Sequence, residues 1–214
     1  MHPLVLHGHG WCELRRPARG TVLRPCLFLD RDGCIVVEVH HLHRVEDTAL
    51  IPGAAETIAA ANAAGWYVVE VTNQSGIARG LFGWDEFAAV QDRIHTELAE
   101  AGAAIDLVLA SPWHTDGTGP WQGEHDWRKP GPGMLQQAAR VLPIDLARSW
   151  IVGDHATDIA AGRAAGIAAG LHVATGHGAR HRAEALALAT DRYRVRGIDS
   201  LADVAAIAPW KQAA

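Results

Sequence analysis

Short apolar runs alternate along this chain with longer segments of helical periodicity. Runs rich in β-branched and aromatic residues predict strands, at residues 26–30, 67–72, 107–110, 150–154, 169–173 and 193–195. Alanine-rich or amphipathic segments between them predict helices, at residues 53–64, 85–101, 133–142, 158–165 and 183–189, with a last short helix near the end. The alternation predicts an α/β fold, a Rossmann-like and mainly parallel sheet with helices on both faces.

Three stretches fall outside this alternation. Residues 1–25 carry Pro, Gly, Arg and His without periodicity, so we expect an N-terminal extension that is partly disordered or draped over the surface. Residues 26–214 are then expected to form a single domain. The segment 33–52 is expected to form a loop or small hairpin, whose three histidines face a substrate, lie exposed or bind a metal. The segment 111–131 is a long loop, and such loops in compact domains are usually functional.

Composition excludes several classes of function. The chain has 214 residues, 20% of them charged, and a net charge of −5, which argues against a basic nucleic-acid footprint. Its three cysteines form no Cys-x-x-Cys pair, which favours a reducing, cytoplasmic setting. Apolar runs stay well short of the roughly 20 residues of a membrane span. We therefore expect a cytoplasmic monomer with neither nucleic-acid nor membrane partners, and no secretory signal.

The candidate chemistry begins where the first predicted strand ends. Asp30 and Asp32 follow that strand, and the ligands of open α/β sheets bind at this edge. Asp30 can act as a nucleophile that accepts a phosphoryl group. Asp32 can protonate the leaving oxygen and then activate water. The pair alone is a common chance pattern, usually a solvated turn.

Further polar groups follow other predicted strands in a suitable order. Thr72, Asn73 and Lys129 can stabilise the charge of a transferring phosphoryl group. Magnesium prefers oxygen ligands and takes one or two carboxylates together with phosphate and water. Asp30, the backbone carbonyl of Asp32 and Asp154 can provide such a Mg²⁺ site, with Asp158 in support. The joint occurrence predicts phosphoryl transfer through an aspartyl-phosphate.

Four longer motifs carry a family resemblance. They are FLDRDG at 28–33, VTNQSGIARG at 71–80, RKPGPGM at 128–134 and VGDHATDIAAG at 152–162. Together they resemble the haloacid dehalogenase (HAD) superfamily of phosphatases, and within it the branch of histidinol-phosphatases and heptose-bisphosphate phosphatases. The resemblance covers about residues 27–206. It implies a minimally capped fold, Mg²⁺ and the aspartyl-phosphate mechanism.

The same resemblance implies where a substrate binds. Its motifs carry substrate-binding roles over to Gln74, Ser75, Arg79 and Arg128, beside Lys129. Arginine suits a second phosphate because its planar fork binds phosphate oxygens in pairs. The expected partner is a small phosphorylated sugar, and D-glycero-D-manno-heptose 1,7-bisphosphate is the first choice. Histidinol phosphate or another small metabolite is the alternative, and a catalytically silent phosphate-binding protein is the alternative of another class.

The sequence departs from this branch in its long loop. Relatives often carry a zinc site there, with Cys-x-His at its start and Cys-x-Cys before Arg-Lys-Pro. Here Ser111-Pro112-Trp113 and His125-Asp126-Trp127 occupy those places. Structural zinc needs four thiolate or imidazole ligands, so we expect no structural Zn²⁺ and expect Trp113, Trp121 and Trp127 to pack in its place. An improvised site of His114, His125 and Asp116 or Asp126 is the alternative.

Overall fold

A single eight-stranded sheet forms the centre of the computed structural model, which describes residues 2 and 4–208. Its strands lie in the order β1-β2-β5-β4-β3-β6-β7-β8. Their bounds are β1 Val5–Leu6, β2 Gly10–Leu14, β3 Cys26–Leu29, β4 Tyr67–Asn73, β5 Leu107–Ser111, β6 Trp150–Gly153, β7 Ala169–His172 and β8 Arg194–Gly197. The six strands from β5 to β8 in this order are parallel, which confirms the expected Rossmann-like α/β fold.

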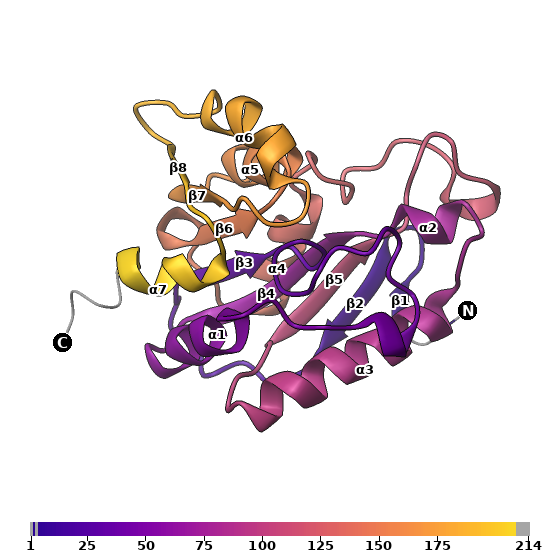
Figure 1. Ribbon diagram of the computed structural model, residues 1–214, viewed down its shortest axis with the longest axis horizontal. Helices are drawn as coiled ribbons and strands as arrows, with labels where there is room; N and C mark the ends of the chain where they lie inside the picture. The colour runs from indigo at the N-terminus through magenta and orange to yellow at the C-terminus, as the bar shows by residue number, and fades with distance from the viewer. Residues whose placement is uncertain (1, 3, 209–214) are drawn as a thin grey trace.

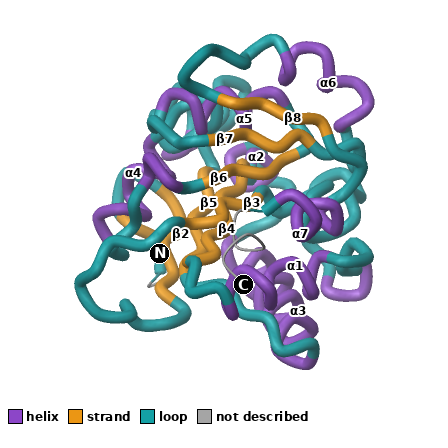
Figure 2. The backbone as a smooth tube through the Cα atoms, turned by 90° about the vertical axis from the view of Figure 1, so that its left-hand side faces the viewer, coloured by secondary structure: helices purple, strands orange, loops and turns teal. Residues whose placement is uncertain are grey.

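Helices cover both faces of this sheet (Figures 1 and 2). They are α1 Ala54–Ala63, α2 Ser75–Ala78, α3 Trp84–Glu100, α4 Gly133–Val141, α5 Ala156–Ala164, α6 Gly178–Leu186 and α7 Val204–Ile207. Apolar side chains of α1, α3 and α7 join one core cluster, and those of α4 join the cluster on the opposite face. No helix in the described part of the chain combines the length and apolarity needed to cross a membrane.

The sequences of the central strands are nearly continuous apolar runs because both faces of these strands are buried. In β3, Leu27 and Leu29 belong to the cluster under α1 and α3, whereas Cys26 and Phe28 belong to the cluster under α4. All four side chains are fully buried. This two-sided burial is what a parallel sheet between helical layers requires.

The N-terminal segment differs from our expectation. Residues 5–6 and 10–14 form the antiparallel strands β1 and β2, and Trp11 of β2 pairs with Ala110 of β5. Trp11 is 1% exposed and stacks on Trp84, with 5.6 Å between the ring centroids. The expectation of a disordered or draped segment is therefore wrong for these residues, because β5 offers an open sheet edge that they complete.

The order of the strands places one edge of the sheet at a crossover. The chain passes from β3 through β4 to β5 on one side, and then returns to the other side of β3 with β6. Asp30 follows β3, Thr72 and Asn73 end β4, and Asp154 follows β6. Ligands of open α/β sheets bind outside the carboxyl ends of strands at such a switch point. The predicted residues thus arrive at the same edge.

Candidate active site

Three carboxylates from two strand ends meet at this edge. Asp30 follows β3, Asp154 follows β6, and Asp158 lies in the first turn of α5; each offers an oxygen within 4.8 Å of the others. Burial raises the pKa of Asp30 well above its usual range, with Asp158 as the next cause. Burial and Asp158 also raise the pKa of Asp154 to about 7. An all-oxygen set that repels itself in this way fits a hard divalent cation such as Mg²⁺.

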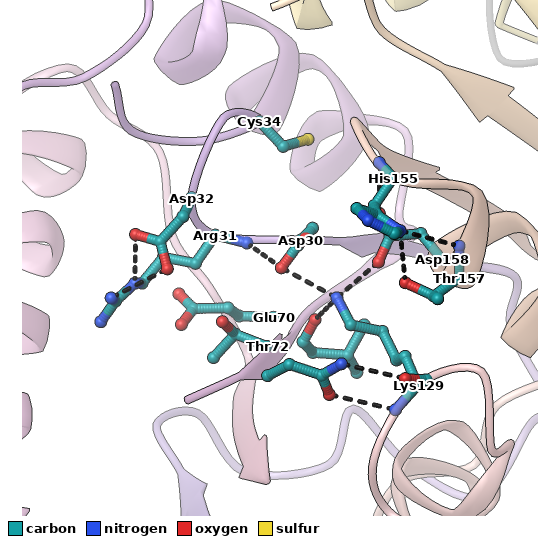
Figure 3. A network of polar contacts seen from close by, with 12 residues as sticks. Asp30, Arg31, Asp32, Cys34, Glu70, Thr72, Lys129, His155, Thr157 and Asp158 are labelled. Carbon is teal, nitrogen blue, oxygen red and sulfur yellow. Dashed lines mark hydrogen bonds and ion pairs between the residues drawn. The ribbon is translucent and has the colours of Figure 1, made fainter. Parts of the chain in front are cut away.

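Lys129 provides a positive charge inside this cluster. Its Nζ lies 2.8 Å from Asp30 Oδ1 and 2.6 Å from Asp158 Oδ1, and donates to the carbonyl of Val71 at 2.8 Å. Figure 3 shows the ammonium group between the two carboxylates. Burial alone lowers the pKa of Lys129, but Asp158 and Asp30 more than offset this effect, so the net shift is upward. The lysine therefore stays charged.

Asp32 points away from the three carboxylates. Arg31 binds it through two hydrogen bonds, in which Nε donates to Oδ1 at 3.1 Å and Nη2 donates to Oδ2 at 3.0 Å. Gln74 Nε2 donates to the same Oδ2 at 2.9 Å and also to Thr72 Oγ1 at 2.9 Å. The Asp32 carboxyl group is thus fixed from two sides. Its backbone carbonyl stays a predicted metal ligand, whereas its carboxylate does not belong to the group of three.

Asn73 ties two active-site segments together. Its Nδ2 donates to the carbonyl of Lys129 at 3.0 Å, and its Oδ1 accepts from the Lys129 backbone N–H at 3.0 Å. Both ends of the amide are therefore occupied by the Lys129 backbone. The structure gives Asn73 a positioning contact, and the phosphoryl contact expected from the sequence stays a prediction.

Two glycines let the backbone approach the carboxylate of Asp154. Gly33 and Gly176 have φ angles of +74° and +57°, and a Cβ on either one would overlap Asp154 Oδ2. The backbone N–H of His177 donates to this oxygen at 2.6 Å. The loop after β7 therefore helps to hold a carboxylate from β6.

A second group of cations lies at the rim of the same pocket, which has a volume of about 350 Å³ and also includes Ser75. Arg79 Nη2 lies 2.9 Å from His114 Nε2, and Arg128 Nη1 donates to the carbonyl of Trp113 at 3.0 Å. Burial lowers the pKa of Arg128, and the nearby charge of Arg79 acts in the same direction. Two neighbouring guanidinium groups favour an anion between them. Arg79 and Arg128 thus line one pocket, and their predicted role in substrate binding stays a prediction.

Aromatic rings fill the long loop at the places where relatives carry zinc ligands. Trp113 stacks on His125 at 4.6 Å and meets Trp121 edge-on at 5.5 Å. His9 from the N-terminal hairpin stacks on Trp127 at 5.2 Å. In residues 2 and 4–208, Asp30, Asp154 and Asp158 form the one group of three ligating side chains close enough to hold a metal ion. His114 and His125 are not part of such a group.

Glu38 and His177 line the pocket although the sequence prediction gives them no role. His40 and His41 line it too, from the segment whose histidines are expected to face a substrate, lie exposed or bind a metal. His40 and His41 adopt the left-handed φ angles +56° and +61°, which are uncommon outside glycine. The crowding of histidines in this segment can be seen in the sequence, whereas the left-handed backbone of His40 and His41 cannot. The contact of His177 is made by its N–H group and has no sequence signature.

Comparisons with known proteins agree with this geometry. A HAD-hydrolase-like family model matches residues 126–204. A D-glycero-beta-D-manno-heptose-1,7-bisphosphate 7-phosphatase from Mesorhizobium japonicum is 50% identical over 147 residues, 68% of this chain and 68% of that protein. A phosphatase of the same name from Rhodopseudomonas palustris is 44% identical, over 67% of this chain and 81% of the relative.

Solved structures lead to the same family. A HAD-like phosphatase from Mesorhizobium loti has a TM-score of 0.84 and 40% identity, with 95% of each chain covered. The D,D-heptose 1,7-bisphosphate phosphatase from B. bronchiseptica, solved with magnesium and phosphate, has a TM-score of 0.76 and 34% identity, over 89% of this chain and 99% of that chain. The chain therefore belongs to the HAD-type phosphatases, in the family of the heptose-1,7-bisphosphate 7-phosphatases, and is a phosphoric monoester hydrolase.

Proposed function

We propose that this enzyme removes the 7-phosphate of D-glycero-D-manno-heptose 1,7-bisphosphate in a Mg²⁺-dependent reaction. The observation that carries the proposal is the arrangement of two aspartates at one pocket. Asp30 lies against Lys129 at 2.8 Å, and the Asp32 carboxyl group is held apart from it by Arg31 and Gln74. Two carboxyl groups in such different surroundings suit two different tasks. The substrate follows from the family, in which relatives carry this name.

The first step is attack by the Asp30 carboxylate on phosphorus. A new O–P bond forms to Asp30, and the bond between phosphorus and the sugar oxygen breaks. Asp32 gives its proton to the departing oxygen, which leaves as a hydroxyl group. Lys129 offsets the charge on Asp30 and on the phosphoryl oxygens, and Thr72 borders the same space. Mg²⁺, held by Asp30, the Asp32 carbonyl and Asp154 with Asp158 in support, would supply further charge neutralisation.

The second step is hydrolysis of the aspartyl-phosphate. Asp32, now ionised, takes a proton from water, and the oxygen of that water attacks phosphorus. Inorganic phosphate leaves, the Asp30 carboxylate is restored, and Asp32 again carries a proton. One residue thus serves both half-reactions without moving. Its fixation by Arg31 and Gln74 supports this role.

The second phosphate of the substrate is proposed to bind Arg79 and Arg128. These guanidinium groups line the same pocket as Asp30 and Asp154 but belong to different segments of the chain. Bidentate recognition of phosphate is a property of arginine. We further propose that the enzyme acts as a cytoplasmic monomer without nucleic-acid partners. The net charge of −5 supports the last of these points. Packing of the tryptophan-rich loop, without structural zinc, is part of the same proposal.

A phosphate-release panel tests the function. The enzyme is assayed with the heptose 1,7-bisphosphate, fructose 1,6-bisphosphate and histidinol phosphate, with Mg²⁺ or with EDTA. We expect the highest kcat/KM for the heptose ester, loss of activity in EDTA, and no turnover by Asp30→Asn. Arg128→Ala should raise KM for the bisphosphate at least tenfold, and KM for p-nitrophenyl phosphate far less. Equal low rates on all three esters would refute the substrate assignment.

A further inference from the structure

A buried glutamate lies beside the catalytic pair but does not border the pocket. Glu70 belongs to β4 and is fully buried. Its Oε1 accepts a hydrogen bond from Gln91 Nε2 at 2.8 Å, whereas its Oε2 has no hydrogen-bond partner among the described residues. A carboxylate taken out of water costs free energy unless a charge or several hydrogen bonds compensate it. Glu70 therefore calls for a cation nearby.

Arg31 is that cation. Its side chain is also fully buried. Burial raises the pKa of Glu70 to about 7, and the charge of Arg31 is the largest effect in the opposite direction. Gln91 connects the two, because its amide donates to Glu70 while its Oε1 accepts from Arg31 Nη1 at 3.4 Å. Figure 3 shows the Glu70 side chain between those of Arg31 and Thr72.

The guanidinium of Arg31 is fixed on its other sides as well. Its Nη2 donates to the carbonyl of Leu42 at 3.3 Å, and the group lies 5.4 Å from the centre of the Phe87 ring. Its Nε and Nη2 also donate the two hydrogen bonds to the Asp32 carboxyl group. A continuous chain of contacts thus runs from Glu70 through Gln91 and Arg31 to the Asp32 carboxyl group.

We propose that Glu70 and Gln91 are positioning residues, which hold the Arg31 guanidinium and through it direct the Asp32 carboxyl group toward the leaving oxygen. The inference rests on the proposed function, in which Asp32 is the acid and base. Above its pKa of about 7, Glu70 supplies negative charge beside Arg31, and the hydrogen bonds of Gln91 orient the guanidinium group. Without Glu70 and Gln91, Asp32 is the one charged partner of the Arg31 guanidinium group that the structure describes. The two side chains can then reorient together.

The choice of leaving group separates this role from a merely structural one. The parameter kcat/KM reports the first half-reaction alone, so it is independent of the later role of Asp32 as a base. p-Nitrophenolate departs without a proton, so its kcat/KM gains little from a well-directed Asp32. Phenolate gains more, and a sugar oxygen gains most. Glu70→Gln keeps the length of the side chain and an acceptor for Gln91 but removes the charge, and Gln91→Leu removes both hydrogen bonds. Val68→Ala, on the same face of β4, is the matched control for lost packing.

We expect each of the two variants to lower kcat/KM for phenyl phosphate and for the heptose bisphosphate about tenfold. The kcat/KM for p-nitrophenyl phosphate should fall by less than about twofold. General acid catalysis as a whole contributes about 10²- to 10⁴-fold, so a misdirected acid loses part of that range. The double variant should lose about as much as the larger single loss, because both residues act through Arg31. Val68→Ala should leave the ratio of the three rates unchanged.

Two outcomes would overturn the inference: the same loss on every ester, or no loss on the poor leaving groups. Because two variants are used, one that fails to fold still leaves the other to decide. The proposed function has its own signature of failure. If wild type hydrolyses no ester faster than Asp30→Asn, the function falls and this inference falls with it. An active wild type without leaving-group dependence in the variants overturns the positioning role alone.

Discussion

Replacing Lys129 by methionine removes the one cation that contacts Asp30 and Asp158 among the described residues. Its Nζ lies 2.8 Å from Asp30 and 2.6 Å from Asp158, and the side chain is 1% exposed. At an effective dielectric constant of about 20, each contact contributes about 6 kcal/mol of attraction. Burial of the ammonium group costs several kcal/mol in return. We therefore expect Lys129→Met to lower the free energy of unfolding by about 3–5 kcal/mol without Mg²⁺.

The loss should depend on pH in a defined direction. The pKa of Asp154 in the folded protein is raised from 3.8 to about 7. Such a carboxyl group stabilises the folded state when protonated, and this contribution is lost as the pH rises through about 7. Without Lys129 the three carboxylates repel one another more strongly. The deficit of Lys129→Met should therefore be smaller at pH 5 than at pH 8.

Urea unfolding with EDTA, at both pH values, measures this deficit. Arg140→Met is the matched control, because it removes a positive charge from the last turn of α4, away from the carboxylates. It should cost less than about 1 kcal/mol. A deficit of Lys129→Met below about 1 kcal/mol, or one that is equal at pH 5 and pH 8, would refute the charge-balance reasoning.

Three further predictions concern other parts of the molecule. Gly176→Ala should raise the Mg²⁺ concentration needed for half-maximal activity at least tenfold, because its Cβ would overlap Asp154. Gly166→Ala, at a similar φ angle with open space around it, should leave that concentration unchanged. Trp113→Ala should lower the free energy of unfolding by about 2–4 kcal/mol in urea, and dialysed wild type should hold far less than one equivalent of zinc by elemental analysis; stoichiometric zinc would contradict this. Burial lowers the pKa of His95 to about 4, so the folded state loses stability as the pH falls from about 6.5 toward 4. His95→Leu should reduce that loss by about 1–3 kcal/mol in acid titrations. An acid unfolding curve identical to that of wild type would show that burial of His95 does not cause the loss.

The parts of the fold that the sequence predicts well are those with a local cause. β3 and β4 are apolar on both faces, so their residues are uniform in character and easily recognised. The catalytic set could be predicted because strand ends of a parallel sheet share one edge. Asp30, Thr72 and Asp154 are each next to a strand and needed no further information to be placed together.

Other features depend on partners that are distant along the chain. β2 has a short and imperfect alternation, and its stability comes from β5 and from the ring of Trp84. Gln74 carries a substrate-binding role by motif, yet its amide binds Asp32 and Thr72. Glu70 interrupts an apolar strand, and strand register pairs it with Leu29 at the end of β3, two residues before Arg31. Sequence patterns do not contain these pairings because each depends on two separately folded segments.

The pairing of β2 with β5 also bears on the order in which the protein matures. Ribosomes make this hairpin before β5, but Trp11 pairs with Ala110, so β2 has only the short strand β1 beside it until the chain through β5 has emerged. During that interval an apolar ribbon with unused backbone groups is exposed, which is the situation that invites wrong pairing between nascent chains. His9 reaches its place on Trp127 later still. The hairpin that closes the sheet edge in the finished enzyme is thus open to such wrong pairing until β5 has been made.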